Sequence, residues 1–323
     1  MAPVVFVTRP LPEPGISPLV EAGFDVRSNA EDRPLTRDEL LTGVADAAAV
    51  VATLSDRVDA ELLDAAPRLK VVANYAVGFD NVDVAEARRR GVEVTTTPDV
   101  LSEATADLAW ALLLAAARRL GEGERLVRAG EWKGPGPRQL LGQPVGGRTL
   151  GIVGMGAIGR AVARRARGFS MPVVYFNRNR VPDAVEHELG ARYLPLDELL
   201  ATADFVSLHA PLNDESRHLV DASALARMKS TAVLVNTARG ALVDEPALVQ
   251  ALREGRIAAA GLDVFEREPQ LADGLAELDN VVVSPHVGSA TTDTRAAMVR
   301  LCVENVVEVL AGRPAVTPAP APS

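Results

Sequence analysis

The stretch that most constrains the fold runs from Thr149 to Arg180 and reads TLGIVGMGAIGRAVARRARGFSMPVVYFNRNR. An apolar run ends at Val153, the glycines of a G-x-G-x-x-G pattern follow, and apolar residues then recur at helical spacing before a second apolar run at 173–176. In such a pattern the first glycine permits a tight turn, the second lets the backbone approach a pyrophosphate, and the third packs helix against sheet. All parts fit within the roughly 30 residues of one βαβ unit, so we favour dinucleotide binding over an ordinary glycine turn. We expect phosphates on the amides of Gly154, Gly156, Ala157, Ile158 and Gly159.

Length, charge and cysteine content exclude several classes of protein. The 323 residues suffice for two domains, and the net charge of −9 argues against broad nucleic-acid binding. Cys302 is the single cysteine, so no intrachain disulfide forms, and its apolar helical surroundings predict a buried structural thiol. No His/Cys spacing indicates a metal site, and no apolar segment is long enough for a signal peptide or a membrane span. We therefore expect a cytoplasmic protein without a metal.

Short apolar runs alternate with helical segments along most of the chain, which predicts an α/β protein with parallel sheets. The expected strands cover residues 4–8, 50–53, 69–74, 92–96, 204–208, 233–236, 258–262 and 281–284, besides the two described above. A domain crossing is expected at Pro98–Asp99, before a helix at 101–120 that is apolar on all sides and hence buried. Residues 121–148 are interpreted as an irregular arm, and the proline-rich residues 316–323 as disordered.

Two of the four histidines lie where a parallel sheet places ligands, at the carboxyl ends of expected strands. These are His209 and His286, and the residues alone do not decide between them as a proton donor. His187 and His218 lie in polar segments and are expected on solvated faces.

Other side chains near strand ends complete a set suited to reducing a carbonyl beside a carboxylate. A proton-donating histidine needs a nearby carboxylate, which Glu268 in the turn FEREP could provide. Arg239 ends the run VLVNT, and its planar guanidinium would bind a carboxylate at two points. The amides of the loop at 75–78 are candidate anion donors, although a plain loop explains them equally well.

The segments VNTARGALVDEPALVQALREGRIAAAGLDVFEREP, NVVVSPHVGSAT and YAVGFDNVD resemble signature stretches of the D-isomer-specific 2-hydroxyacid dehydrogenases. Within that family the chain is most similar to the glyoxylate/hydroxypyruvate reductases. The resemblance implies two Rossmann-like lobes with parallel sheets. A dinucleotide-binding lobe, residues 99–288, would be inserted into a flavodoxin-like substrate lobe made of residues 1–98 and 289–323.

The resemblance also implies roles for individual residues. His286 would protonate the nascent alkoxide while hydride leaves C4 of the nicotinamide, and Glu268 would favour the imidazolium form of that histidine. Arg239 would bind the substrate carboxylate and polarise the 2-oxo group, with the amides of Val77 and Gly78 on the carboxylate's other side. The positions that line the cofactor in the family fall on Thr105, His209, Ala210, Pro211, Thr237, Ala238, Asp263, His286 and Gly288.

Two departures from common family patterns concern specificity. Many dehydrogenases place Asp or Glu after the second strand to bind the adenosine ribose, whereas this chain has Asn177-Arg178-Asn179-Arg180. Arg178 and Arg180 could pair with a 2′-phosphate, which favours NADPH, while a solvated basic turn would accept NADH as well. Pro135 stands where related reductases tend to carry Trp, so Trp132 alone remains to shape the substrate pocket from the arm.

The function implied is NADPH-dependent reduction of a small 2-oxo acid, glyoxylate or hydroxypyruvate, to the D-2-hydroxy acid. The alternatives are a dehydrogenase for another D-2-hydroxy acid such as 3-phosphoglycerate, and a nucleotide-sensing corepressor-like protein that shares the fold. The loop YAVGFD carries no cation for a phosphate. We expect no nucleic-acid or membrane partner, and a homodimer formed through the 101–120 helix and the 121–148 arm.

Overall fold

The computed structural model describes residues 2–320, and contacts within the chain divide it into two units. The first unit joins Met1–Leu101 to Ser289–Ser323, and the second is the continuous stretch Ser102–Gly288. The chain passes from the first unit to the second between residues 101 and 102. The sequence pattern predicts this boundary three residues earlier, between residues 98 and 99. The protein is thus an α/β protein in which one unit is inserted into the other.

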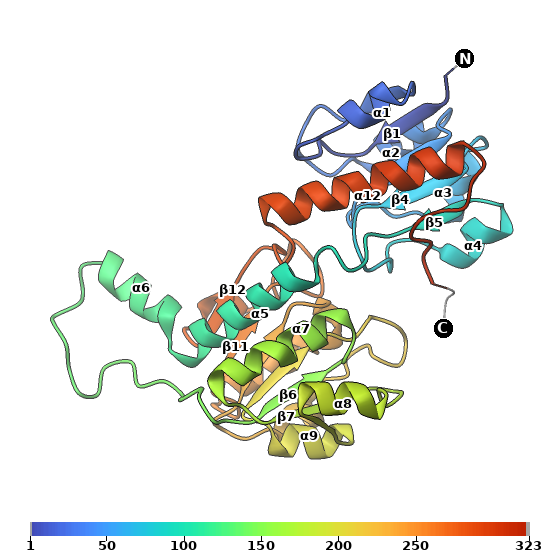
Figure 1. The fold of residues 1–323 in the computed structure, drawn as a ribbon. Helices are drawn as coiled ribbons and strands as arrows, with labels where there is room; N and C mark the ends of the chain where they lie inside the picture. The colour runs from blue at the N-terminus through green and yellow to red at the C-terminus, as the bar shows by residue number, and fades with distance from the viewer. Residues whose placement is uncertain (1, 321–323) are drawn as a thin grey trace. The chain divides into compact units, whose positions relative to one another are not determined.

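The first unit is built on a five-stranded parallel sheet of order β2-β1-β3-β4-β5, the flavodoxin-like order. Its strands are β1 (Val4–Val7), β2 (Asp25–Ser28), β3 (Ala49–Ala52), β4 (Val71–Asn74) and β5 (Glu93–Thr95). Its helices are α1 (Ser17–Glu21), α2 (Arg37–Val44), α3 (Ala60–Ala65), α4 (Val84–Arg89) and α12 (Thr292–Leu310), drawn in Figure 1. β3 and β4 are buried along their whole length, which explains their apolar sequence up to the final Asn74 of β4.

The last described residues add to this sheet. Pro318 forms an antiparallel bridge with Thr95, and the Ala319 amide donates to the carbonyl of Val94 at 2.7 Å. The Thr317 hydroxyl donates to the carbonyl of Thr96 at 2.7 Å. The disorder expected for this proline-rich tail is therefore wrong for residues 316–320, because proline is tolerated at a sheet edge where it need not donate. Residues 321–323 lie outside the described part.

The second unit is built on a seven-stranded parallel sheet of order β12-β11-β10-β9-β6-β7-β8. This is the Rossmann order with one further strand, and the order reverses between β6 and β9, where this fold class binds ligands. The strands are β6 (Leu150–Val153), β7 (Val173–Phe176), β8 (Ala191–Tyr193), β9 (Phe205–Leu208), β10 (Val233–Asn236), β11 (Ala259–Leu262) and β12 (Val281–Val283).

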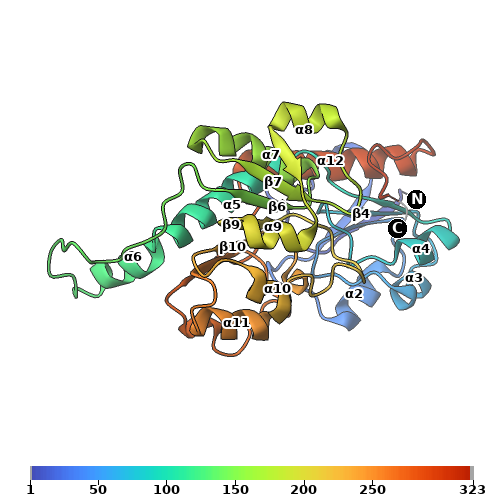
Figure 2. The same cartoon turned by 90° about the horizontal axis from the view of Figure 1, so that it is seen from below.

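Helices cover both faces of the seven-stranded sheet, as Figure 2 shows. One face carries α5 (Ser102–Ala117), α7 (Ala157–Ala166) and α8 (Asp183–Leu189), and the other carries α9 (Leu196–Thr202), α10 (Ala222–Arg227) and α11 (Glu245–Arg253). Short 3-10 turns occupy Arg167–Phe169, Gly240–Leu242 and Leu275–Glu277. Each face has its own apolar core, so the sheet is buried on both sides.

The apolar helix α5 packs against α7, β10 and β11, and the Trp110 indole donates to the carbonyl of Val162 at 3.1 Å. Arg165 of α7 pairs with Glu103 and Asp107 of α5 at 2.8 and 2.6 Å. The buried position expected for this helix is therefore achieved within its own unit.

An arm extends from the end of α5, and Figures 1 and 2 both show it projecting from the seven-stranded unit. It begins with the helix α6 (Leu120–Arg128), which corrects the expectation of an irregular arm from residue 121. Two glycines and the absence of buried residues on α6 explain why the sequence pattern hides it. The chain returns to the body where the Gln143 amide donates to the carbonyl of Ala117 at 2.8 Å.

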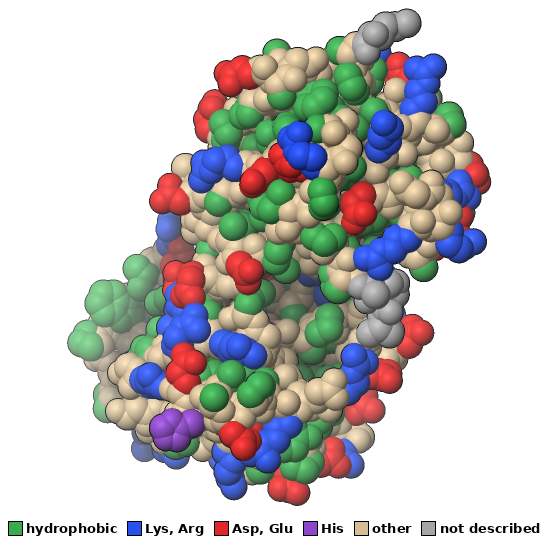
Figure 3. All heavy atoms as spheres, turned by 45° about the vertical axis from the view of Figure 1, so that its right-hand side comes forward, with side chains coloured by type: hydrophobic (Ala, Val, Ile, Leu, Met, Phe, Trp, Pro, Cys, Tyr) green, Lys and Arg blue, Asp and Glu red, His purple; other side chains and the backbone are tan. Residues whose placement is uncertain are grey.

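Acidic and basic side chains are interspersed over the face drawn in Figure 3. Within the described residues, the helices are all too short or too polar to cross a bilayer.

Candidate active site

The glycine turn between β6 and α7 has the shape that a pyrophosphate requires. Gly154 has φ 99°, and a Cβ there would lie 2.5 Å from the Ala210 amide nitrogen, while a Cβ at Gly159 would overlap the carbonyl of Gly154. A Cβ at Gly156 would meet nothing within 4 Å, so open space lies beside the middle of the turn. Gly156 is the N-cap of α7, and no side chain caps the first amides of that helix. The turn therefore offers free amides to an anion.

Two polar atoms at neighbouring strand ends also fit a bound cofactor. The His209 Nδ1 and Thr237 Oγ1 atoms, which follow β9 and β10, are buried without a hydrogen-bond partner among residues 2–320. Buried polar groups are nearly always paired, so these atoms indicate a place where a ligand group binds.

The surroundings of His209 exclude it as a proton donor. Its Nε2 lies 2.8 Å from the Ser207 hydroxyl, and burial lowers its pKa to about 3. The ring is therefore neutral throughout the physiological range and has no imidazolium proton to give.

His286 has the partner that a proton donor needs. Its Nδ1 lies 2.9 Å from the Glu268 Oε2, which leaves Nε2 as the ring nitrogen for proton transfer. The Glu268 Oε1 accepts a hydrogen bond from the Phe265 amide at 3.0 Å. Burial alone would raise the pKa of Glu268, but the hydrogen bond and charge of His286, the Phe265 amide and the charge of Arg239 together lower it. Glu268 is thus an ionised carboxylate beside the histidine.

The buried Asp263 shapes the loop that carries His286. The carboxylate accepts hydrogen bonds from the Ser284 hydroxyl at 2.6 Å and from the Val287 and Gly288 amides at 2.9 and 2.8 Å. The carbonyl of Asp263 accepts the His286 amide at 2.8 Å, and His286 is held at φ 53°. A left-handed conformation is strained for a residue other than glycine, and such strain is concentrated at functional sites.

Arg239 lies in a loop after β10 whose shape is set by Asn236. The Asn236 side chain donates to the carbonyl of Arg239 at 2.8 Å and accepts the Ala238 amide at 3.0 Å. The next residue, Gly240, lies so close to the turn before Glu268 that a Cβ there would overlap the backbone of Phe265. This close approach places the loop of Arg239 directly against the turn that carries Glu268.

The two arginines after β7 differ in their partners. Arg180 makes a two-point pair with Glu186 of α8 at 2.7 and 2.6 Å, and the same carboxylate accepts the Tyr175 hydroxyl. Arg178 makes an exposed pair with Glu215 at 3.2 Å. The neighbouring Asn177 accepts the Met155 amide at 2.6 Å, which ties the end of β7 to the glycine turn.

The loop of Val77 and Gly78 belongs to the first unit and follows β4. The Asn74 side chain donates to the carbonyl of Gly78 at 2.8 Å, and the Asn81 side chain donates to the Asn74 side-chain oxygen Oδ1 at 3.1 Å. The Val77 and Gly78 amides donate no hydrogen bond within residues 2–320, so this loop presents two available donors.

The other expected site residues lie at the carboxyl edge of the seven-stranded sheet. Ala210 and Pro211 follow β9, Ala238 follows β10, and a Cβ on Gly288 would lie 3.3 Å from the Thr105 methyl group and from Asp263. Thus the second unit gathers Thr105, the glycine turn, Arg239, Glu268 and His286 at strand ends. Among the described residues, no group of three or more His, Cys, Asp or Glu side chains is placed to hold a metal.

The sequence pattern missed one cluster beside this site. His187 is exposed, as expected, but the half-exposed His218 pairs through Nε2 with the Glu266 carboxylate at 2.8 Å. Glu245 is 4% exposed and accepts the Glu266 amide at 2.8 Å. Charged residues in polar segments ordinarily face solvent, so the sequence pattern does not predict this cluster. The one indication in the sequence is the pair of glutamates in the turn FEREP.

The inserted Rossmann-type unit, the open glycine turn and the arginine–glutamate–histidine set together define a nucleotide-dependent oxidoreductase. The family model for the NAD-binding domain of the D-isomer-specific 2-hydroxyacid dehydrogenases matches residues 110–288. The chain belongs to the family of D-isomer-specific 2-hydroxyacid dehydrogenases and is an enzyme.

Three relatives show how far the similarity extends. The glyoxylate reductase of Thermococcus onnurineus is 54% identical over 311 residues, which cover 95% of this chain and 92% of that protein. The crystal structure of a Thermus thermophilus protein is 48% identical with a TM-score of 0.91, covering 98% of this chain and 100% of that one. The NADPH-dependent glyoxylate/hydroxypyruvate reductase of Sinorhizobium meliloti, solved with NADP and malonate, is 35% identical with a TM-score of 0.84, covering 98% and 97%.

Proposed function

We propose that this enzyme reduces glyoxylate and hydroxypyruvate to the corresponding D-2-hydroxy acids, with NADPH as its preferred cofactor. The observation that carries the proposal is the pair formed by His286 and the ionised Glu268, beside the loop of Arg239. The substrate class is supported by the glyoxylate reductase that is 54% identical over most of the chain.

In this proposal each catalytic side chain has one task. The nicotinamide, when bound, supplies the hydride. Arg239 of the second unit binds the substrate carboxylate and polarises the 2-oxo group. The first unit offers the amides of Val77 and Gly78 as donors to the substrate. His286 gives the proton on Nε2 to the oxygen that becomes the hydroxyl. Glu268 holds Nδ1 and stabilises the charged ring before the transfer.

The second unit would hold the cofactor at the carboxyl edge of its sheet, and the first would bind substrate. The free amides of the glycine turn would bind the pyrophosphate. The buried, unpartnered His209 Nδ1 and Thr237 Oγ1 would each pair with a polar group of the cofactor. Further contacts would come from Thr105, Gly154, Gly156, Ala157, Ile158, Gly159, Asn177, Ala210, Pro211, Ala238, Asp263, His286 and Gly288.

The preference for NADPH rests on residues 177–180 after β7, which carry two arginines and no acidic residue of their own. Of these two arginines, Arg178 is the better candidate for binding the 2′-phosphate. It forms only a surface ion pair, with the exposed Glu215, and such a pair contributes little stability. Arg180 is committed to Glu186 at two points, and breaking that pair would cost more.

We also propose a cytoplasmic homodimer. The arm exposes Leu120, Val127, Trp132 and Leu141, and α6 has no buried residue. Exposed apolar side chains grouped on a projecting segment indicate an association surface, and a second copy of the arm would cover them symmetrically. The single buried thiol of Cys302 suits a reducing compartment.

The proposal is tested by following NADPH and NADH oxidation with glyoxylate, hydroxypyruvate, pyruvate and phosphohydroxypyruvate. We expect turnover with the first two acids and a higher kcat/KM with NADPH. Preference for phosphohydroxypyruvate would replace the substrate assignment, and equal use of NADH would overturn the cofactor assignment. If none of the four acids is reduced, the proposed activity is wrong.

A further inference from the structure

Glu245 is a buried carboxylate outside the catalytic set. It occupies the first position of α11 and is 4% exposed. Capping of the helix does not explain this burial, because the Asp244 side chain already accepts the Ala247 amide at 3.1 Å. A carboxylate is almost never buried without a partner, so its contact is informative.

That contact reaches the turn that carries Glu268. The Glu245 Oε1 accepts the amide of Glu266 at 2.8 Å, two residues before the catalytic carboxylate. The Glu266 side chain is held in turn by His218 at 2.8 Å. Glu266 is therefore fixed at both its backbone and its side chain.

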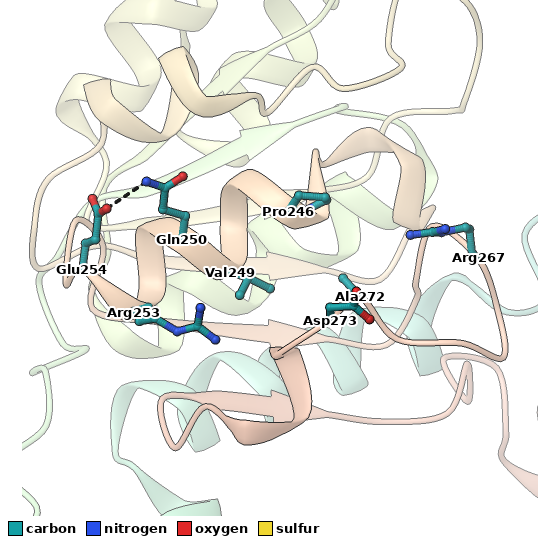
Figure 4. A pocket seen from close by; sticks show the side chains of 8 residues that line it. All are labelled: Pro246, Val249, Gln250, Arg253, Glu254, Arg267, Ala272 and Asp273. Atoms are coloured by element: carbon teal, nitrogen blue, oxygen red, sulfur yellow. Dashed lines mark hydrogen bonds between the residues drawn. The ribbon is translucent and has the colours of Figure 1, made fainter.

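The elements on the two sides of this contact differ in how firmly they are held. α11 is anchored in the core by the buried Leu248, Val249 and Leu252. Residues 267–271 are exposed, and a hollow of about 510 Å³ is lined by α11 together with Arg267, Ala272 and Asp273. Figure 4 shows the side chains that line it. Residues 267–271 therefore have few packing neighbours, and the turn is held by the close contact of Gly240 with Phe265 and Glu266 and by hydrogen bonds from anchored elements.

We propose that Glu245 is a positioning residue for the reaction: its carboxylate holds the Glu266 amide and thereby keeps Glu268 in contact with His286. This inference rests on the function proposed above. The charged groups around Glu245 are Glu266, Arg267 and Glu268, and burial, the largest effect, raises the pKa of Glu245. The substitution Glu245→Gln is therefore a mild change, because the glutamine side chain has the same shape and keeps an oxygen that can accept the Glu266 amide.

The test compares Glu245→Ala, Glu245→Asp and Glu245→Gln with Glu254→Ala. Glu254 lies just after the same helix and pairs at the surface with Gln250 and Arg256. Misplacement of a catalytic group by about 1 Å costs on the order of 100-fold in rate. We therefore expect kcat with glyoxylate to fall by about 10- to 100-fold in Glu245→Ala, and also in Glu245→Asp, because aspartate is too short to reach the Glu266 amide. Glu245→Gln should retain most of the activity, and Glu254→Ala should retain all of it. The Kd for NADPH should not change.

The pH profile separates positioning from a merely structural role. The charged group in contact with the His286 ring is Glu268, on which the charge of Arg239 also acts, and the substitution is expected to displace Glu268. Displacement of Glu268 would break its hydrogen bond with His286, so the pH profile of kcat/KM in Glu245→Ala should differ from that of the wild type, whereas a merely structural loss would lower kcat/KM equally at every pH. Lowered thermal stability with unchanged kcat and pH profile would overturn the proposal, as would an aspartate variant that behaves like the wild type.

Two further measurements keep the inference testable on its own. If Glu245→Ala does not fold, the contrast between the aspartate and glutamine variants decides the question. If the wild type reduces no 2-oxo acid, the proposed function fails, yet NMR titration of the His286 ring still compares wild type and variant. An unchanged ring titration in Glu245→Asp would then refute the positioning role.

Discussion

At the scale of single residues, proton chemistry at this site depends on what surrounds each histidine. His209 and His286 both follow strands of the seven-stranded sheet. Burial without a charged partner lowers the pKa of His209 to about 3, whereas His286 contacts an ionised carboxylate at 2.9 Å. The residues alone left both histidines open, because neither burial nor the contact with Glu268 can be derived from position along a strand.

The pair of His286 and Glu268 leads to a prediction about pH. His286→Ala should lower kcat by about 100- to 10,000-fold, the usual contribution of general acid catalysis, while NADPH still binds. In Glu268→Gln kcat should also fall, because the carboxylate that contacts Nδ1 of His286 is gone. The lowered pKa of Glu268 keeps it ionised through mildly acidic pH, so we expect no acid loss above the ordinary glutamate pKa of about 4.3.

Steady-state kinetics between pH 5 and pH 10, roughly the range in which histidine and its neighbours titrate, measure both effects. His209→Gln is the control, since a neutral ring replaced by a neutral amide should leave the pH profile where it was. Persistent activity in His286→Ala would assign the proton donor elsewhere.

The two arginines after β7 provide a matched pair of variants. Arg178→Ala should raise KM for NADPH by about 10- to 100-fold, equivalent to the loss of one charge-assisted hydrogen bond, and leave KM for NADH unchanged. Arg180→Ala should change the ratio of the two KM values less, because Arg180 already pairs with Glu186. The opposite ranking would show that the salt bridge to Glu186 opens when the cofactor binds.

At the scale of elements, buried strands could be predicted and exposed edges could not. β3, β4, β6, β9 and β10 are buried along their whole length, and each is mostly apolar in sequence. β2 has the sequence DVRS with three exposed residues, and no apolar pattern marks it. The helices α2 and α9 were not predicted either, since short helices with few buried residues have weak periodicity.

Of the site residues, Arg239, Glu268 and His286 were named from the sequence. Glu245 was not, because its burial depends on the tertiary fold.

The loop that carries Arg239 contacts the turn that carries Glu268, and this contact predicts the effect of adding a methyl group at Gly240. Gly240→Ala places a Cβ against the backbone of Phe265 and should cost about 1–3 kcal/mol of unfolding free energy, together with most of kcat. Gly168→Ala is the control, because a Cβ there meets nothing within 4 Å. Urea unfolding and kinetics on both variants decide the matter, and an active Gly240→Ala of normal stability would contradict the packing described.

At the scale of the whole molecule, the arm predicts the oligomeric state. Leu120→Asp combined with Val127→Asp should convert a dimer into a monomer in sedimentation velocity, because charges would be buried in the interface. Val20→Asp, which changes an exposed valine of the first unit, should leave the dimer intact. A wild type that sediments as a monomer would remove the arm's proposed role.

The hydrogen bond from Gln143 to Ala117 joins the two ends of the arm at the body of the second unit. The seven-stranded sheet, its helices and the catalytic loops are all complete outside residues 118–142. The segment is therefore an insertion that leaves and rejoins the second unit at one place, and the Arg125–Asp279 ion pair is a further tie to the body. Substitutions of its exposed leucines and valine can thus alter the proposed subunit assembly without shifting the strands that carry the catalytic loops. Changes at Trp132 would act on the substrate pocket as well, if the arm shapes that pocket as the sequence predicts.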